Sequence, residues 1–578
     1  MNADAGTLDR ALRLLDDAWA EVRRGAYVQH QLGEISGRLP DVSFAEAERR
    51  SDAGRAFLAR LDSLDPAGLP HDVLLSLRVV RFRAGFWARE AQWYWLVTDP
   101  LGIGHFGEFL PAAYCGGFLL NLVHGSLASF RFREPADLDR YLALVADYAR
   151  LLGQFSDRTE SQAERGIRMP KVQVTQARAM LTGFKTGARN AIAVDAQRLS
   201  AIESASAAEF GRQVEQRIST QVMPAYDRAL AGLSEDYFAR APEAVGLGQY
   251  TGGSEVYREL VRLHTTLDLS PERVHEYGVA RLREKEDSMA EIRKGLGFKG
   301  GAGGFLAYLH QNPKWRASTE EEITATFQRC IERLKPHYGD YFSMAPSASY
   351  GVAPLPAALR GSMTFGYYEA PRRGHSEGVY FFNPGNLTQQ PLIHIAALTY
   401  HELMPGHHLQ EGIQQENVAV HPLRIYNFVT AHCEGWAEYA ATLAGEIGLY
   451  EEPEERYGRL LFDAFLTCRL IVDTGMNALG WSLERAKAFM REHSGRTEAE
   501  IHSETLRYSC DLPAQVLAYK FGDAHILAMR ESMRRVLGSR FSIKDFHAAI
   551  LLQGSLALPD LEWHVAHETA RLGGTLVS

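Results

Sequence analysis

TYHELMPGHHLQ, residues 399–410, is the stretch that decides how the chain is interpreted. A His-Glu pair at the end of a helix is typical of zinc peptidases, in which the neutral imidazole binds Zn²⁺ and the glutamate faces the attacking water. In the usual HExxH pattern, the second histidine follows the first by four positions. Here that position is Pro405, which cannot bind a metal. The candidates for a second ligand after His401 are therefore His407 and His408.

The spacing of these histidines sets a geometric condition. In a straight helix His407 and His408 lie roughly 9 and 10.5 Å from His401 along the axis. Two imidazoles that each lie about 2.0–2.1 Å from one ion cannot be so far apart. A metal site therefore requires a bulge or kink at Pro405-Gly406, because proline removes a helical hydrogen bond and glycine tolerates unusual dihedral angles.

A third ligand is expected in AHCEGWAEY, residues 431–439. Zinc sites of the gluzincin type take a glutamate from a second helix downstream of the histidines. Glu434 would complete a set of two histidines and one glutamate that leaves a fourth position open for water. Glu438 lies four residues later on the same helical face, where it would support the site or lie at the surface.

Composition excludes several classes of protein. The 578 residues include 62 basic and 71 acidic side chains, so the net charge is −9, which argues against a nucleic-acid partner. The five cysteines are scattered without a CxxC pair, which argues against a disulfide scaffold and favours a cytoplasmic location. Residues 109–130 are uncharged, but they are interrupted by glycine, proline and asparagine, so we expect a buried helix and no membrane partner. The oligomeric state cannot be read from the sequence.

Most of the chain is predicted to be helical. Residues 8–22, 45–64 and 135–155 repeat apolar side chains at spacings of three and four. Strand patterns are few, the clearest at Gly378–Asn383 and a second around Met363–Tyr368. We therefore expect a mainly α protein with one small β-sheet, in two lobes or one large subdivided domain. The glycine-rich run at residues 295–304 is expected to be a loop or hinge.

Several blocks together resemble a known family. HELMPGHHLQ, EGWAEY, RYSCDLPAQVLAYKFG and FHAAILLQGSLALPDLE are similar to the signature blocks of the bacterial domain-of-unknown-function family numbered eight hundred eighty-five, which is grouped with the gluzincin metallopeptidases. The resemblance covers most of the chain from about residue 215 onward. It implies a large helical zincin-like fold with a deep cleft, similar to thimet-type oligopeptidases and helical carboxypeptidases. Residues 1–215 would form one wall of that cleft, and residues 216–578 the catalytic region.

The resemblance also implies roles for the residues of the site. Matching the HExGH pattern of those peptidases to Gly406-His407 makes His401, His407 and Glu434 the ligands of one Zn²⁺ per chain, with Glu402 as the general base. His408 remains the alternative second ligand.

Further residues are expected from the downstream blocks and from the predicted strand. Tyr508, in preference to Tyr519, would stabilise the oxyanion. The strand at Val379–Asn383 would border the cleft and hold substrate at its edge. The predicted substrate-binding residues are Arg507, Lys520, Gln515 and Tyr380.

The predicted function is zinc-dependent hydrolysis of peptide or amide bonds, with a peptide or small amide as substrate. One alternative is hydrolysis of a modified amino acid or another non-peptide amide, which would use the same centre. The other is a non-catalytic metal- or peptide-binding protein. In that case a fourth protein ligand, such as His408 or His432, would close the site.

Overall fold

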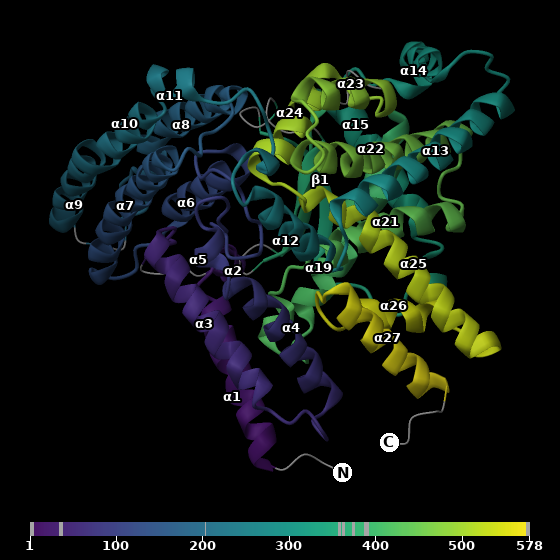
Figure 1. The fold of residues 1–578 in the computed structure, drawn as a ribbon, viewed down its shortest axis with the longest axis horizontal. Coiled ribbons are helices and arrows are strands. Elements are labelled where there is room, and N and C mark those ends of the chain that lie inside the picture. The colour runs from purple at the N-terminus through teal and green to yellow at the C-terminus, as the bar shows by residue number, and fades with distance from the viewer. Residues whose placement is uncertain are drawn as a thin grey trace. The chain divides into compact units, whose positions relative to one another are not determined.

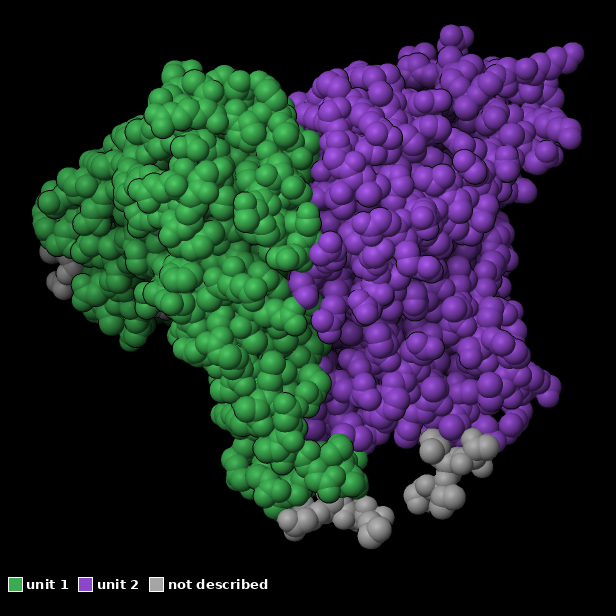
Figure 2. Space-filling view, in the orientation of Figure 1, with its two compact units in different colours: residues 1–69, 80–256, 509–513 green, residues 70–79, 257–508, 514–578 purple. Residues whose placement is uncertain are grey.

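The structure is a computed structural model that describes residues 5–33, 38–200, 202, 204–356, 360, 365–372, 376–385 and 392–573. It is mainly helical with one small mixed sheet, which confirms the predicted fold class (Figure 1). The chain forms two compact units, which Figure 2 shows in different colours and which are described separately below. The predicted division at residue 215, with an N-terminal wall of a cleft, stays a prediction.

Unit 1 comprises residues 1–69, 80–256 and 509–513. Three elements have residues in both units: α4 (His71–Trp87), α12 (Gly253–Thr265) and η7 (Arg507–Asp511). The elements that lie wholly in unit 1 are α1 (Ala5–Val22), α2 (Ala26–Leu32), α3 (Phe44–Asp62), α5 (Glu90–Trp93), η1 (Ala113–Gly117), α6 (Phe118–Ser129), α7 (Ala136–Glu164), α8 (Lys171–Ile192), α9 (Ser204–Arg217), η2 (Ile218–Val222), α10 (Met223–Gly232), α11 (Glu235–Arg240) and η3 (Leu247–Gln249).

The helices of unit 1 follow the apolar periodicity of the sequence. Helix α1 buries Ala11, Leu14, Leu15, Ala18 and Val22, a series of positions three and four apart that forms one stripe. Helices α3 and α7 likewise cover the second and third predicted stretches. Each leucine or valine buried in this way stabilises the unit by about 1.5–3 kcal/mol relative to full exposure. The uncharged stretch at residues 109–130 forms η1 and α6, and α6 buries four apolar side chains, in agreement with the expected core helix.

Unit 2 comprises residues 70–79, 257–508 and 514–578. Its helical elements are α13 (Pro271–Gly295), α14 (Ala302–Gln311), η4 (Pro313–Trp315), α15 (Glu320–Leu334), α16 (Tyr338–Tyr341), η6 (Leu392–His394), α18 (Ile395–Glu402), α19 (His407–Glu416), α20 (Pro422–Ile425), α21 (Thr430–Ile447), α22 (Pro453–Asn477), α23 (Leu483–His493), α24 (Glu498–Leu506), η8 (Gln515–Leu517), α25 (Ala518–Leu537), η9 (Gly538–Arg540), α26 (Ile543–Leu551) and α27 (Leu558–Gly573).

The sheet of unit 2 has three strands in the order β1-β3-β2. Strand β1 (Ser349–Pro354) pairs in parallel with β3 (Glu377–Phe382), and β2 (Gly366–Glu369) pairs antiparallel to β3. Strands β2 and β3 match the two predicted strands, but Met363 and Thr364 of the second prediction lie outside the described residues. Because β3 is the central strand, both of its edges are occupied.

Two glycines bring α21 and α25 unusually close together. A Cβ atom built on Gly435 would lie 2.4 Å from the Cα of Gly522, so neither position has room for a side chain without a shift of backbone. Glu434 immediately precedes the first glycine, and Tyr519 lies three residues before the second. The close crossing therefore places these two side chains in the same region of unit 2.

Candidate metal centre

The chain leaves the helical path between the two histidines. Helix α18 ends at Glu402, and α19 begins at His407, so the predicted kink is a complete break between two helices. The Met404–Pro405 peptide is cis, and the indole Nε1 of Trp436 donates a hydrogen bond to the carbonyl oxygen of Pro405 (2.9 Å).

Gly406 is required in this turn for space. A Cβ atom at Gly406 would lie 1.8 Å from the carbonyl oxygen of His401. The dihedral angles of Gly406, φ −81° and ψ −128°, fall outside the helical and extended regions. The unusual dihedral angles expected from the sequence are therefore present, and close backbone approach is a second reason for glycine at this position.

Three buried donor atoms converge after this break. Oε2 of Glu434 lies 3.6 Å from Nε2 of His401 and 3.3 Å from Nε2 of His407. One donor atom from each of the three residues lies within 4.8 Å of the others. Burial opposes ionisation of Glu434, but the two imidazoles beside it hold its pKa well below the usual range. The arrangement is a candidate metal site, composed of the three residues that the resemblance implied.

His408 points to different partners. Its Nδ1 is hydrogen-bonded to the hydroxyl of Tyr368 (2.8 Å), and its Nε2 lies 3.2 Å from the carbonyl oxygen of Ala348. Burial lowers the pKa of His408 to about 4. Both ring nitrogens therefore serve the contact between α19 and the sheet. The structure does not bring the alternative ligand to the other donors.

Glu438 contacts Nδ1 of His401, the ring nitrogen that is not directed at the other donors. Its Oε1 lies 3.0 Å from Nδ1 of His401, and its Oε2 is bound by Arg459 (3.0 Å) and approached by Lys520 (3.4 Å). Burial opposes ionisation of Glu438, yet the charges of Arg459 and Lys520 lower its pKa to about 2. A carboxylate at the outer nitrogen of a ligating histidine fixes the tautomer and the orientation of the ring. The sequence left open whether Glu438 supports the site or lies at the surface, and its burial and its contact with His401 favour a supporting role.

Glu411 has a related position, which the sequence analysis did not identify. Its Oε1 lies 3.8 Å from Nδ1 of His407, one helical turn away on α19. Burial raises the pKa of Glu411 to about 7, despite the opposing effect of His407. The signal that could have found it is the four-residue spacing from His407, which places the two side chains on one face.

Glu402 and Tyr380 lie close enough to interact electrostatically. Glu402 is the last residue of α18, and burial raises its pKa above the usual value. Tyr380 is fully buried in the central strand, where its ring lies 5.6 Å from that of Phe327. Burial, and then the charge of Glu402, raise the pKa of Tyr380 well above its normal value. Tyr380 is thus placed in the core of the sheet beside the expected base.

The two candidate tyrosines have different surroundings. The ring of Tyr519 lies parallel to that of His401 at a centroid distance of 6.3 Å, and its pKa is raised by burial and by Glu434. The hydroxyl of Tyr508 is bound by Glu504 and by Nε of Arg469 (3.0 Å). Tyr519 is therefore beside the donor atoms, whereas the hydroxyl of Tyr508 belongs to a neighbouring ion pair.

The remaining predicted residues also separate. Lys520 is buried and forms ion pairs with Asp463 and Asp523, both at 2.9 Å. Its charge therefore belongs to the network that holds Glu438. Arg507 donates a hydrogen bond to the side-chain oxygen of Gln515, and its charge opposes the rise in the pKa of Tyr519. Arg507 and Gln515 thus form a pair in the vicinity of Tyr519.

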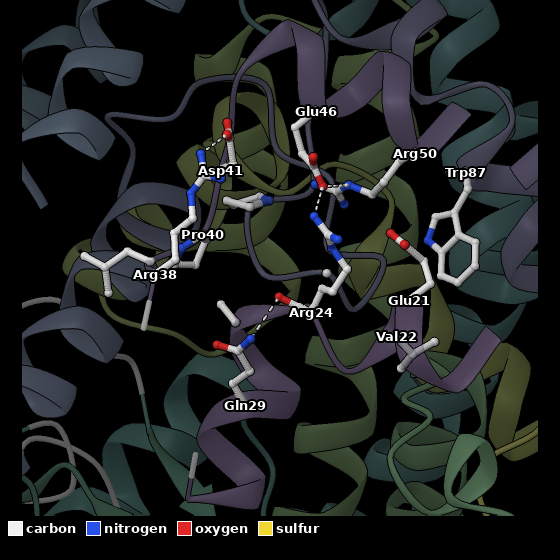
Figure 3. A pocket seen from close by; sticks show the side chains of 15 residues that line it. Glu21, Val22, Arg24, Gln29, Arg38, Pro40, Asp41, Glu46, Arg50 and Trp87 are labelled. Carbon is white, nitrogen blue, oxygen red and sulfur yellow. Dashed lines mark hydrogen bonds and ion pairs between the residues drawn. The ribbon is translucent and has the colours of Figure 1, made fainter. Parts of the chain in front are cut away.

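A cavity of about 210 Å³ in unit 1 is lined by none of these residues (Figure 3). Its charged side chains pair with one another, as Arg38 does with Asp41 (3.1 Å) and Arg24 does with Glu46 (3.9 Å). At the candidate metal centre, by contrast, one carboxylate atom faces two imidazole nitrogens, since Oε2 of Glu434 lies 3.6 Å from Nε2 of His401 and 3.3 Å from Nε2 of His407. Converging donors of this kind distinguish the candidate metal centre from the cavity.

Comparison with known proteins supports the fold and the family. The profile of the family described as bacterial protein of unknown function (DUF885) matches residues 27–565. The structure is similar to a protein from Colwellia psychrerythraea provisionally described as a lipoprotein, with 22% identity, a TM-score of 0.84 and coverage of 98% of this chain and 99% of the other. A protein of unknown function from Shewanella oneidensis, also provisionally described as a lipoprotein, has 16% identity, a TM-score of 0.72 and coverage of 97% and 99%.

Curated proteins show no match to this chain. In the part of the chain that the structure describes, no helix is both long enough and apolar enough to cross a membrane.

Proposed function

The chain belongs to the DUF885 family of bacterial proteins of unknown function, and from the chemistry of its buried donor set we propose that it is a zinc-dependent hydrolase of peptide or amide bonds. The observation that carries the proposal is the convergence of His401, His407 and Glu434, with Glu402 directly after the first histidine. Two imidazoles, one carboxylate and an open position are the donor set of catalytic zinc sites. A purely structural site has no need of the adjacent glutamate.

Two of the three distances between donor atoms match those of a tetrahedral ion. Ligands that lie about 2.0–2.2 Å from zinc are separated from one another by roughly 3.3–3.6 Å. The two nitrogen–oxygen distances at Glu434, 3.3 and 3.6 Å, agree with this spacing. Both histidines present Nε2 to the site. Nδ1 of His401 lies at hydrogen-bond distance from Glu438, as is common for ligating histidines, whereas Nδ1 of His407 lies 3.8 Å from Glu411.

Each residue then has a chemical role. When bound, zinc supplies Lewis acidity and lowers the pKa of water to about 7. Glu402 takes the proton of the attacking water and delivers it to the leaving nitrogen. The hydroxyl of Tyr519 donates to the developing oxyanion, and a donor of this kind contributes about 10²–10³ in rate. The position of Tyr519 beside His401 leads us to prefer it over Tyr508.

An extended substrate fits the edge of β2 better than the edge of β3. The predicted strand edge is unavailable because β3 pairs on both sides, whereas β2 pairs only with β3 among the described residues. The ring of Tyr368 in β2 lies parallel to that of His407 at 6.3 Å. We therefore propose that a peptide pairs with β2 as an added strand and that Arg507, held by Gln515, binds its carboxylate. The predicted cytoplasmic location stays a prediction.

The decisive experiment measures zinc content and hydrolysis in the same samples. Wild type is compared with His401→Ala, Glu402→Gln and His408→Ala, using a mixed peptide library and a panel of acylated amino acids. We expect about one zinc per chain in wild type, none in His401→Ala, and retained zinc without turnover in Glu402→Gln. His408→Ala is the matched control from the same block, and it should keep its zinc.

The other outcomes discriminate among the alternatives. Cleavage of the acylated amino acids alone would identify a non-peptide amide as the substrate. Zinc without cleavage of any substrate would favour a metal- or peptide-binding protein. Loss of zinc in His408→Ala but not in a His407→Ala variant would reverse the choice of the second ligand.

A further inference from the structure

A second feature of unit 2 lies where α13 ends and α14 begins. We define the tip segment as residues 293–316, which Figure 1 shows at the upper right edge of the view. It contains five basic residues and no aspartate or glutamate, although the chain as a whole has a net charge of −9. The basic residues are Arg293, Lys294, Lys299, Lys314 and Arg316.

The local structure of the tip segment is well defined. Helix α13 ends in a left-handed turn at Gly297 (φ 71°), a conformation that favours glycine. There the N–H of Phe298 donates to the carbonyl oxygen of Arg293 (3.0 Å). This turn folds Phe298 back, so that its ring lies 5.0 Å from that of Phe305. Phe305 is buried and its ring lies 4.8 Å from that of Tyr457 on α22, so the tip segment is anchored to the core of unit 2.

Apolar side chains remain exposed on this anchored turn. Leu296 is 39% exposed and Tyr308 is 49% exposed. The ring of Tyr308 lies 5.7 Å from that of the half-buried Phe298, so the aromatic side chains form a series from the core to the solvent. The intervening residues 300–304 are four glycines and one alanine. No large side chain therefore separates this apolar group from a surface that approaches the turn.

Part of the basic charge is uncompensated. Lys299 and Arg316 form no ion pair with any residue that the structure describes, and Lys294 lies at a distance of 3.7 Å from Glu291. Lys314 is paired with Glu452 at 2.9 Å. The free cations thus belong to the same segment as the exposed apolar side chains.

We propose that the tip segment docks the protein on the surface of an anionic lipid bilayer. Leu296, Phe298 and Tyr308 would lie at the level of the headgroups, where amphipathic aromatic rings are favoured. Lys299 and Arg316 would face the lipid phosphates, each contributing about a fivefold gain in affinity. Stable attachment to a membrane requires two weak signals together, and the segment supplies an apolar and an electrostatic one.

A protein partner fits this surface less well. A stable protein interface buries about 800 Å² on each partner, far more than three partly exposed side chains and a run of glycines provide. The expectation of no membrane contact came from the absence of a spanning segment and does not apply to docking at the surface. The net charge of the whole chain likewise does not describe this segment.

The test is sedimentation of the full chain with lipid vesicles. Vesicles of phosphatidylcholine are compared with vesicles that also contain phosphatidylglycerol, at low and high salt. The variants are Leu296→Ser with Tyr308→Ser, and Lys299→Glu. The matched control is Arg535→Glu with Val536→Ser on α25, where an exposed cation adjoins a valine that is 65% exposed. Thermal unfolding of each variant shows that the fold is retained.

We expect binding to the anionic vesicles only, and weaker binding at high salt. Lys299→Glu reverses one charge and should weaken binding about 25-fold, as two charge units of roughly fivefold each predict. The variant Leu296→Ser with Tyr308→Ser should bind more weakly, with the same salt dependence as wild type. The control variant should bind as tightly as wild type. Absence of binding, equal binding to both vesicles, or equal loss in the control would overturn the proposal. Capture of a protein through the tip segment by a chain that does not bind vesicles would also overturn it.

Discussion

The two histidines of the candidate metal centre have similar ligand positions but different supports. Nδ1 of His401 lies 3.0 Å from Glu438, a carboxylate that cations hold in its ionised form. Nδ1 of His407 lies 3.8 Å from Glu411, which forms no ion pair with a lysine or arginine of the described residues and has a pKa of about 7. One histidine is thus braced by a fixed charge, and the other adjoins a carboxyl group that ionises near neutral pH.

This difference indicates how the site divides its tasks. An ionised carboxylate at hydrogen-bond distance holds the proton on Nδ1 of His401 and leaves Nε2 free to bind a metal. At 3.8 Å, Glu411 is beyond hydrogen-bond distance and orients His407 less strictly. We infer that His401 is oriented more strictly than His407.

The largest effect is expected from Gly406→Ala, which would disturb the positions of both His401 and His407. Its Cβ would lie 1.8 Å from the carbonyl oxygen of His401, so the turn would have to shift by more than the roughly 0.5 Å that a metal site tolerates. Zinc content, measured after dialysis, should fall to background. The control is Gly445→Ala, whose Cβ would make only an ordinary contact of 3.5 Å with Tyr450. Stoichiometric zinc in Gly406→Ala would refute the role of close approach.

Glu438→Gln is expected to have the next largest effect, and it tests the support of His401. The network contains three cations, Arg459, Lys520 and Lys285, and three carboxylates, Glu438, Asp463 and Asp523. Removing one buried carboxylate leaves an unpaired positive charge and should cost about 3–5 kcal/mol of stability. Zinc affinity should fall about 10–100-fold, because the orientation of His401 is lost.

Asp523→Asn separates these two effects. It removes a carboxylate from the same network without touching His401, since Asp523 pairs with Lys520. We expect a similar loss of stability in urea unfolding, with zinc affinity close to that of wild type. An equal loss of affinity in both variants would show that the network acts through stability and not through the orientation of His401.

The candidate metal ligands could be predicted from the sequence more completely than their surroundings. His401, Glu402 and Glu434 stand in motifs whose spacing has a chemical meaning, and α1, α3 and α7 follow apolar periodicity, so both could be predicted locally. The position of His408 against β1 and β2 depends on a sheet contact between distant segments, which no local pattern specifies. The central place of β3 was missed because strand order is set by pairing, which β1 completes from outside the predicted strands. Lys520 and Tyr508 lie in blocks that resemble the family, but Lys520 forms an ion pair with the distant Asp463. The hydroxyl of Tyr508 donates to Glu504, four residues earlier, and accepts from the distant Arg469.

The support of His407 predicts a pH dependence in protein freed of metal by a chelator. The pKa of Glu411 is raised from 4.5 to about 7 in the folded chain, so the folded state binds more protons than the unfolded state between these values. Stability contributed by the protonated carboxyl is fully present below pH 4.5 and decreases as the pH rises toward 7, by at most about 3 kcal/mol. Urea unfolding at several pH values measures the decrease. Glu411→Gln, which cannot ionise, should lack this component, and an unchanged slope in that variant would refute the assignment.

The smallest effect is expected for zinc affinity in Glu411→Gln. Because the carboxyl group lies 3.8 Å from Nδ1 of His407, its loss should weaken zinc binding by about tenfold or less, the lower end of the range for residues that support ligands. The measurement is competition with a chromophoric chelator, alongside Glu438→Gln and a Glu416→Gln control on the same helix. If Glu411→Gln weakened binding as much as Glu438→Gln, the two histidines would be equally braced. The distance of 3.8 Å between Glu411 and Nδ1 of His407 would then not weaken its effect on the ligand.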